Sequence, residues 1–175
     1  MITIVTGGSK CGKSSLSEHI LDRSFSGGKY YIATMQPFGN DAHEAIERHR
    51  KMRSGKGFVT IEKYTDVHEI NISEKCGILL ECMGNLCANE MFSGDKPDYP
   101  ADRIVYSVRK LAEHAEHLVI VTNEVGSDGI TYTPETELYK KAMAEINGRT
   151  AQIADNVIEC VYGLPVILKG ELPCL

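Results

Sequence analysis

The sequence lacks the cysteine patterns and the leader that mark secreted proteins. Its six cysteines form no Cys-x-x-Cys pair and no zinc-finger grouping with histidine, which argues against a disulfide framework and a structural zinc. The chain also has no basic N-terminal segment followed by an apolar core and a small-residue cleavage site. We therefore expect a reduced, cytoplasmic compartment.

Long hydrophobic runs and an excess of positive charge are absent as well. Apolar runs such as LVIVT and GILLEC fall far below the ~20 residues that a bilayer-spanning helix needs, so no membrane span is expected. The formal net charge of −5 argues against a general nucleic-acid surface, because binding to the phosphate backbone uses a basic face. Small-molecule substrates are favoured.

What the sequence does contain is an alternation of short β-branched runs with helical patterns. Strands are predicted at MITIVT, KYYIAT, FVTIEKY, GILLEC and HLVIVTNEV, and in a last pair at NVIECVYG and PVILKG. Helices are predicted over 13–22, 41–53, 84–92 and 101–116, and from Pro134 into the 150s. This alternation predicts one α/β domain over residues 1–175, with a mainly parallel sheet flanked by helices.

The stretch GGSKCGKS, Gly7 to Ser14, matches the phosphate-loop pattern of Gly, any four residues, Gly-Lys-Ser. It lies between a predicted strand and a predicted helix, so its backbone N–H groups would converge on phosphate oxygens at a helix N-terminus. Lys13 would reach the β and γ phosphates, and the Ser14 hydroxyl would hold Mg²⁺. We therefore predict a P-loop NTPase-like (RecA-like) fold, a chance glycine-rich turn being the weaker alternative. Cys11 is either a redox thiol or, as we favour, a small filler of the loop.

Two acidic residues follow predicted strands, where open α/β sheets place their ligands. Glu81 ends GILLE and Glu124 follows LVIVTN. Either carboxylate would serve to orient a Mg²⁺-bound water or to accept a substrate proton. For each residue taken singly, a solvated carboxylate at a strand end is an equally good interpretation.

A histidine lies among cations in the predicted helix 41–53. His49 falls three residues from Ile46 and from Met52 on an apolar stripe, and it is flanked by Arg48, Arg50, Lys51 and Arg53. From these residues alone, packing is the better interpretation of the histidine and a solvated face that of the cations. His114 and His117 have the i, i+3 spacing of a metal-binding pair, but surface positions better explain these two histidines and His43.

Six motifs follow one another along the chain, and together they carry a resemblance to a known family: the phosphate loop, YIAT, ERHRKMR, LLEC, VTNEVG and GLPVILKG. Over nearly its whole length the chain resembles the bifunctional adenosylcobinamide kinase/adenosylcobinamide-phosphate guanylyltransferase family of cobalamin synthesis. The most specific pieces are VTNEVG after a strand, the LLEC strand followed by Asn89 and Phe92, and the run formed by Ile46, His49 and Arg53.

The resemblance implies that GMP becomes attached to His49, with Lys13 and Glu81 as further catalytic residues and Ser14 and Glu81 at the metal. It also implies that the protein uses ATP, GTP and Mg²⁺ and that its substrate is a corrinoid. No nucleic-acid partner is expected, and the chain should form a homo-oligomer, specifically a trimer. The nucleotide contacts that it implies are Gly7, Gly8, Ser9, Lys10, Cys11, Gly12, Lys13, Ser14, Thr34, Met35, Gln36, Arg50, Lys51, Met52, Arg53, Glu62 and Glu81.

The chain departs from the family pattern at five positions. Lys10 and Cys11 replace an Arg-Ser pair, Ala45 an arginine and Gly148 a polar residue, while Phe58 replaces a tryptophan and lies one residue later. These departures leave open a P-loop kinase of an unrelated small molecule and a nucleotide-binding paralogue that lacks one or both activities. A GTP-switched regulatory module is disfavoured, because such modules typically carry Asn-Lys-x-Asp and Asp-x-x-Gly and this chain has neither.

Overall fold

The computed structural model describes residues 1–37, 47, 55–72, 75–95 and 97–172. Within them, a seven-stranded sheet has the order β3-β2-β4-β5-β1-β6-β7. Neighbouring strands are parallel, except that β7 runs antiparallel to β6, so the predicted mainly parallel sheet is confirmed. The strands are β1 (Ile2–Thr6), β2 (Lys29–Ala33), β3 (Phe58–Glu62), β4 (Cys76–Glu81), β5 (Ala115–Val121), β6 (Asn156–Val161) and β7 (Leu164–Lys169).

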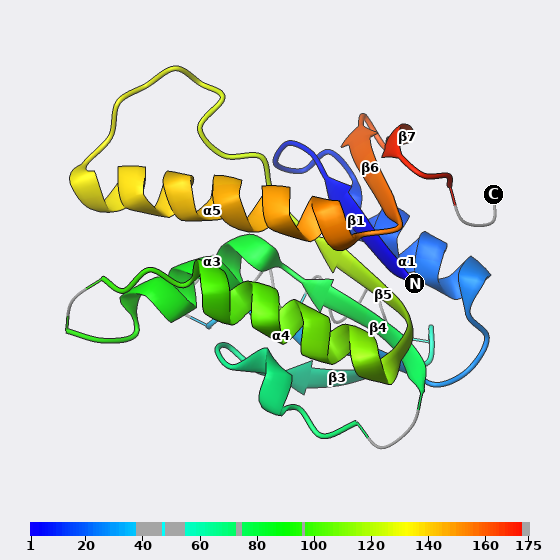
Figure 1. The fold of residues 1–175 in the computed structure, drawn as a ribbon. Helices are drawn as coiled ribbons and strands as arrows, with labels where there is room; N and C mark the ends of the chain where they lie inside the picture. Colours follow the sequence, from blue (N-terminus) through cyan, green and yellow to red (C-terminus); the bar gives the residue numbers. More distant parts are fainter. Residues whose placement is uncertain (38–46, 48–54, 73–74, 96, 173–175) are drawn as a thin grey trace.

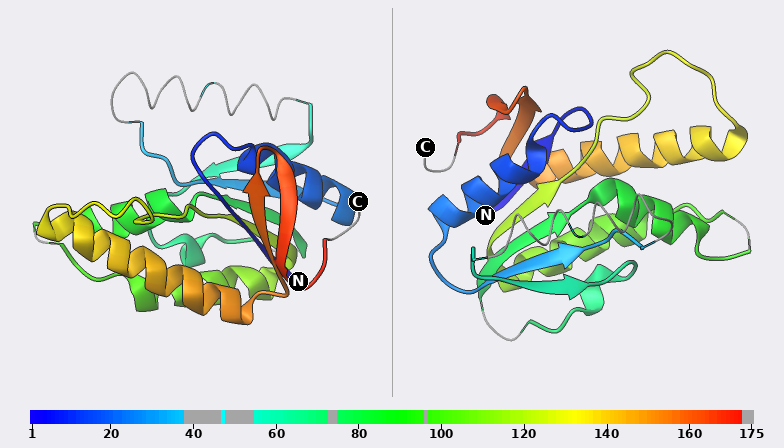
Figure 2. Two further views of the ribbon diagram at one scale, coloured as in Figure 1. Left: turned by 90° about the horizontal axis from the view of Figure 1, so that it is seen from above. Right: turned by 180° about the vertical axis from the view of Figure 1, so that it is seen from behind.

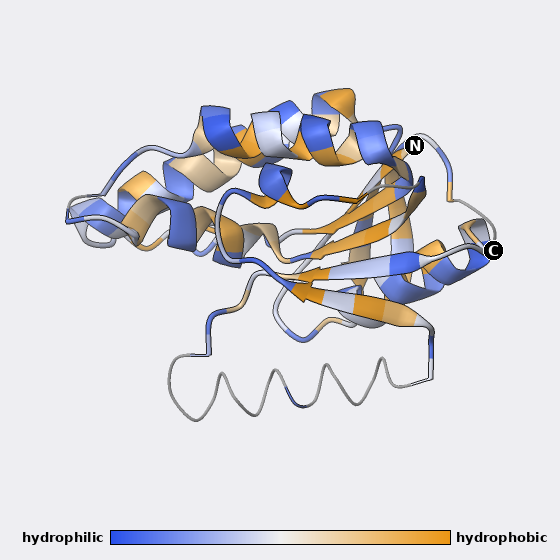
Figure 3. Cartoon of the chain, turned by 90° about the horizontal axis from the view of Figure 1, so that it is seen from below, coloured by the Kyte–Doolittle hydropathy of each residue, from blue (hydrophilic) through white to orange (hydrophobic). Residues whose placement is uncertain are grey.

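Helices cover both faces of this sheet (Figure 1, Figure 2). Helix α1 (Lys13–Ser24) packs on one face, and α3 (Met83–Phe92), α4 (Ala101–His114) and α5 (Pro134–Ile153) lie on the other. A short 3₁₀ turn, η1 (Val67–Glu69), packs against α4. Each face has its own apolar cluster, and the central strands, which carry much apolar colouring in Figure 3, are buried between the two helix layers. The edge strands β3 and β7 are largely exposed.

Local sequence explains where these elements begin and how they pack. Thr133 caps α5, since its hydroxyl accepts the Thr136 N–H, and Pro134 occupies the first turn, where its missing N–H costs nothing. Helix α1 lies close to β4 at Gly77, where an added Cβ would come within 3.0 Å of Leu21 Cδ1 and of Phe25 Cδ1. Helix α1 and the sheet are thus in direct contact at the end of the helix that lies far from the phosphate loop.

Most predicted elements are confirmed with shifted ends. The helix predicted over 13–22 extends to Ser24, and the one predicted over 101–116 ends at His114, where the chain enters β5. The predicted helix 41–53, with His43 and His49, lies outside the described residues apart from Glu47. No helix in the described ranges has the length and apolar character to cross a bilayer.

The prediction that His117 is a surface histidine is wrong. Because α4 ends at His114, the two histidines do not share a helix face, and His117 lies inside β5 with 1% of its surface exposed. Its Nε2 lies 2.8 Å from Thr3 Oγ1 and its Nδ1 lies 2.5 Å from Ser24 Oγ. Burial, with a smaller effect of the N-terminal ammonium group, lowers the pKa of His117 to about 4. Among the described residues, no cluster of three histidine, cysteine or acidic side chains is placed to bind a metal ion.

Candidate functional site

The phosphate loop connects β1 to α1 at the carboxyl edge of the sheet. Gly7 and Gly12 have φ angles of 141° and 102°, in a region that side chains rarely adopt. A Cβ on Gly7 would lie 2.6 Å from the carbonyl oxygen of Cys160, so only glycine fits there. The Leu16 N–H donates to the Gly12 carbonyl at 3.0 Å and starts the helix at the end of the loop. The sequence motif therefore has the backbone form that a phosphate cradle needs.

Lys13 lies folded over this loop. Only 8% of the residue is exposed, and its Nζ donates a 2.7 Å hydrogen bond to the Gly8 carbonyl. The same residue borders the cavity described below. Its ammonium group is therefore held inside the loop, where it would neutralise charge on a bound phosphate chain.

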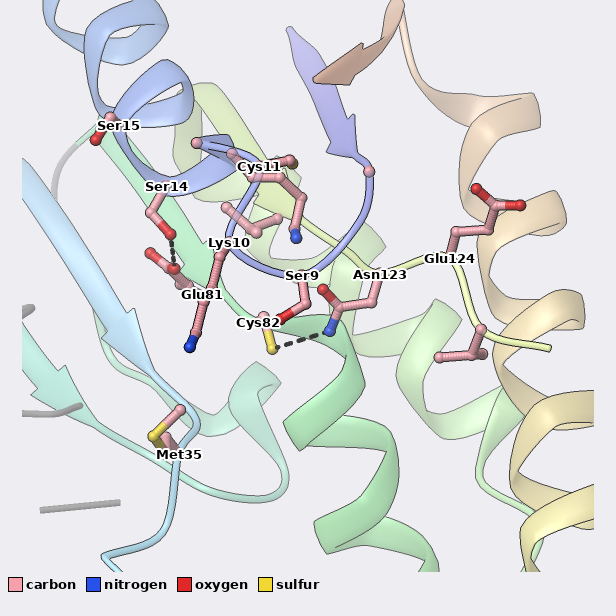
Figure 4. A pocket seen from close by; sticks show the side chains of 15 residues that line it. Ser9, Lys10, Cys11, Ser14, Ser15, Met35, Glu81, Cys82, Asn123 and Glu124 are labelled. Carbon is pink, nitrogen blue, oxygen red and sulfur yellow. Dashed lines mark hydrogen bonds between the residues drawn. The ribbon is translucent and has the colours of Figure 1, made fainter. Parts of the chain in front are cut away.

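Ser14 and Glu81 meet across the site, although they come from different parts of the chain. Strand β4 is separated from β1 by β5 alone, which brings Glu81, the last residue of β4, opposite the first turn of α1. The Ser14 hydroxyl donates to Glu81 Oε1 (Figure 4). The Tyr31 hydroxyl donates to Glu81 Oε2 at 3.0 Å. A hydroxyl and a carboxylate are the oxygen ligands that Mg²⁺ prefers, so this pair fits the predicted metal site.

A cavity of about 740 Å³ opens at this point. Its walls come from the phosphate loop and from the segments that follow β2, β4 and β5. Such a volume lies within the usual range of ligand pockets, and the carboxyl edge of a parallel sheet is where α/β proteins bind nucleotides.

The predicted site residues divide into four groups. The loop residues other than Gly8, together with Met35 and Glu81, line the cavity. Thr34 is buried behind it, with Oγ1 donating to the Cys82 carbonyl and accepting the Cys82 N–H, both at 2.8 Å. Gln36 and Glu62 are absent from the cavity wall formed by the described residues. A last group, His49, Arg50, Lys51, Met52 and Arg53, lies outside the described residues.

The structure separates the two acids that the sequence left equivalent. Glu81 is bonded to Ser14 beside the loop, whereas Glu124 is exposed and lies across the cavity from it (Figure 4). Glu81 is therefore the acid placed to share a cation with Ser14.

Sequence reasoning did not assign a role to Asn123, which follows β5 just before Glu124. Asn123 lines the cavity, and its Nδ2 lies 3.8 Å from Cys82 Sγ (Figure 4). Asn147 on α5 holds this segment, because its amide donates to the Asn123 carbonyl at 3.2 Å and accepts the Thr122 hydroxyl at 2.7 Å. The motif VTNEVG was the available signal, but its spacing alone does not show that Asn123 faces the loop.

A family model described as cobinamide kinase / cobinamide phosphate guanyltransferase matches residues 3–168. The chain belongs to this family. The resemblance seen in the sequence motifs is thereby confirmed. The predicted α/β class, a mainly parallel sheet with the phosphate loop between its first strand and first helix, is confirmed by the strand order.

Relatives match nearly the whole length of the chain. The bifunctional adenosylcobalamin biosynthesis protein CobU of Escherichia coli (strain K12) is 31% identical over 187 residues, which cover 97% of this chain and 100% of that protein. The protein CobP of Pseudomonas aeruginosa, described in the same words, is 24% identical, covering 98% of this chain and 99% of its own length. Among solved structures, an ATPase domain aligns with a TM-score of 0.48 at 10% identity, over 90% of this chain and 68% of that one.

Proposed function

We propose that this chain phosphorylates adenosylcobinamide with a nucleoside triphosphate and then transfers GMP from GTP to the product, giving adenosylcobinamide-GDP for cobalamin synthesis. The observation that carries the proposal is the convergence of Lys13, Ser14 and Glu81 on one cavity in a chain of this family. The names of the relatives, bifunctional proteins of adenosylcobalamin biosynthesis, support both halves of the proposal.

In the first reaction, a hydroxyl oxygen of the corrinoid forms a bond to the γ-phosphorus and loses its proton to solvent. The bond from that phosphorus to the bridging oxygen breaks, and the nucleoside diphosphate leaves. A loose phosphoryl-transfer transition state needs positioning and charge neutralisation more than covalent help. The loop N–H groups and Lys13 hold the phosphate chain, and Ser14 and Glu81 are the residues that would hold Mg²⁺. When bound, Mg²⁺ supplies neutralisation of the phosphate charge.

In the second reaction, we infer that neutral His49 attacks the α-phosphorus of GTP and pyrophosphate leaves. A phosphorus–nitrogen bond to GMP results, and the corrinoid phosphate then displaces the imidazole. Histidine suits both steps, because its neutral ring is a nucleophile near pH 7 and its protonated ring is a good leaving group. The neighbouring cations Arg50, Lys51 and Arg53 are expected to bind the triphosphate.

In the decisive experiment, purified protein is incubated with GTP, Mg²⁺ and adenosylcobinamide, and mass spectrometry follows adenosylcobinamide phosphate and adenosylcobinamide-GDP. ATP is tested as an alternative phosphate donor. Without the corrinoid, intact-mass measurement should find GMP on the wild type and not on His49→Ala, and the bond should be labile in acid and stable in alkali. The variant should still phosphorylate adenosylcobinamide. If the wild type acquires no GMP, the chain is at most a P-loop kinase or a nucleotide-binding paralogue.

We further propose a homo-oligomer, with a trimer as the expected form. The hairpin of β6 and β7 ends the sheet and presents a set of exposed apolar side chains: Val161, Tyr162, Leu164, Val166, Ile167 and Leu168. An open sheet edge with apolar side chains is a surface that another copy of the chain would cover. Sedimentation equilibrium at micromolar concentration should give three times the monomer mass of 19.3 kDa, and a mass equal to that of the monomer would contradict the proposal.

A further inference from the structure

Two cysteines from opposite ends of the chain lie next to each other at the phosphate loop. Cys11 lies in the loop, is partly exposed and lines the cavity. Cys160 lies in β6 with 1% of its surface exposed, and its thiol donates to the Cys11 carbonyl at 3.3 Å. Burial raises the pKa of the Cys160 thiol, and a hydrogen bond with the Cys11 side chain raises it further. The hydrogen bond from the Cys160 thiol to the Cys11 carbonyl places the two residues in contact.

Glycines around the pair allow this approach. A Cβ on Gly7 would lie 3.0 Å from Cys11 Sγ, and one on Gly12 would lie 3.7 Å from Cys160 Sγ. The Cys11 carbonyl also accepts the N–H of Gly163, in the turn after β6, at 2.8 Å. The loop is therefore hydrogen-bonded directly to β6 and to the turn that follows it, with a cysteine on each side of the contact.

We propose that Cys11 and Cys160 form a redox-sensitive thiol pair, which a small-molecule disulfide converts to an intramolecular disulfide that weakens nucleotide binding at the loop. The part that concerns the nucleotide rests on the proposed function, and the pairing itself does not. Cys11 reacts first, because it borders the cavity while Cys160 is buried.

The chemistry is two successive thiol–disulfide exchanges. Deprotonated Cys11 attacks one sulfur of oxidised glutathione, forms a mixed disulfide and releases glutathione thiolate, which takes up a proton. Cys160 then loses its proton, attacks Cys11 Sγ and displaces the second glutathione. Two protein thiols are oxidised by two electrons in all, and one small disulfide is reduced to two thiols.

The disulfide changes the loop because its sulfurs must come to about 2.05 Å from one another, well inside hydrogen-bond contact. Cys160 is fixed in a buried strand, so residue 11 has to move towards β6. That movement displaces the loop N–H groups from the positions that suit a phosphate. By linkage, a bound nucleotide should oppose the disulfide and also shield Cys11.

The experiment treats the full chain with oxidised glutathione, with and without GTP. A tryptic digest without reductant should contain peptide 11–13 linked to peptide 150–169, and GTP should slow its appearance. Calorimetry should show GTP affinity reduced by roughly tenfold or more, in the usual range for coupled sites, and restored by dithiothreitol.

The matched variant is Cys160→Ser, which retains a donor for the Cys11 carbonyl and leaves the cavity wall unchanged. It should bind GTP like the reduced wild type and stop at a glutathione adduct on Cys11, and Cys160→Ala replaces it if the serine variant does not fold. Cys87→Ala, at a buried cysteine on α3, should oxidise as the wild type does.

An adduct without the linked peptide in the wild type, or a linked peptide with unchanged GTP affinity, would overturn the proposal. If the reduced wild type binds no GTP, the proposed function fails, whereas the linked peptide still decides the pairing.

Discussion

His117 should make the protein sensitive to acid, in a way that its hydrogen bonds explain. The Ser24 hydroxyl donates to the Ile20 carbonyl at 2.7 Å, so its oxygen must accept from the imidazole Nδ1–H. Nε2 is then the unprotonated nitrogen and accepts the Thr3 hydroxyl, whose oxygen in turn accepts the Asn156 amide at 3.2 Å. Protonation of Nε2 would reverse the bond to Thr3 and place a charge in a buried site.

The magnitude follows from the lowered pKa. The folded protein holds His117 neutral down to pH about 4, whereas the unfolded chain binds a proton as the pH falls through 6.5. Acid therefore favours the unfolded state progressively between these two values, and the effect is complete below pH 4. At about 1.4 kcal/mol for each pKa unit, His117 alone should lower the free energy of unfolding by about 3 kcal/mol between pH 7 and pH 4.

Urea unfolding followed by circular dichroism at several pH values between 7 and 4 measures this loss. His117→Gln should be less stable than the wild type at pH 7, because it loses part of the hydrogen-bond network, yet its stability should fall by about 3 kcal/mol less on acidification. His114→Gln, at an exposed position, is the control and should follow the wild type. If the curves of the wild type and His117→Gln fall in parallel, the imidazole is not held neutral and our interpretation of the network is wrong.

The remaining predictions concern the loop and the two acids. Lys13→Ala should abolish both phosphoryl and guanylyl transfer, because both reactions use the triphosphate whose charge this ammonium group neutralises. The circular dichroism spectrum should be unchanged, and near-normal kinase turnover would show that the phosphate chain binds elsewhere. Glu81→Gln should raise the Mg²⁺ concentration needed for half-maximal rate severalfold, because it removes a negative oxygen ligand next to Ser14. The same titration of Glu124→Gln should match the wild type, and the opposite pattern would reverse the assignment of the two acids.

The sequence predicted those parts of the molecule whose signals are local. The phosphate loop is a contiguous motif, and the alternation of strands and helices gave the class of fold, as family membership and the sheet confirm. Prediction failed where a property depends on contacts between distant segments. His117 resembled a surface histidine because its partners Thr3 and Ser24 lie far from it in the sequence, near the N-terminus.

The candidate site shows the same division. In the sequence, Glu81 and Glu124 were equally good candidates for the acid at the metal, since both lie at strand ends. Only the strand order brings Glu81 to Ser14. Cys160 carried no signal at all, because its closeness to Cys11 depends on β6 pairing beside β1. The role of His49 stays a prediction, as it lies outside the described residues.

The central place of β1 bears on how the chain folds during synthesis. Of the described strands this one is synthesised before the others, yet its neighbours are β5 and β6, and Thr3 contacts His117 and Asn156 at separations of 114 and 153 positions. Pairing over such distances is slow, and domains fold as units once their sequence has been made. The N-terminal strand and the loop it carries must therefore wait, without their sheet partners, until most of the polypeptide has emerged. A ribosome stalled before β6 should hold a nascent chain that binds no nucleotide.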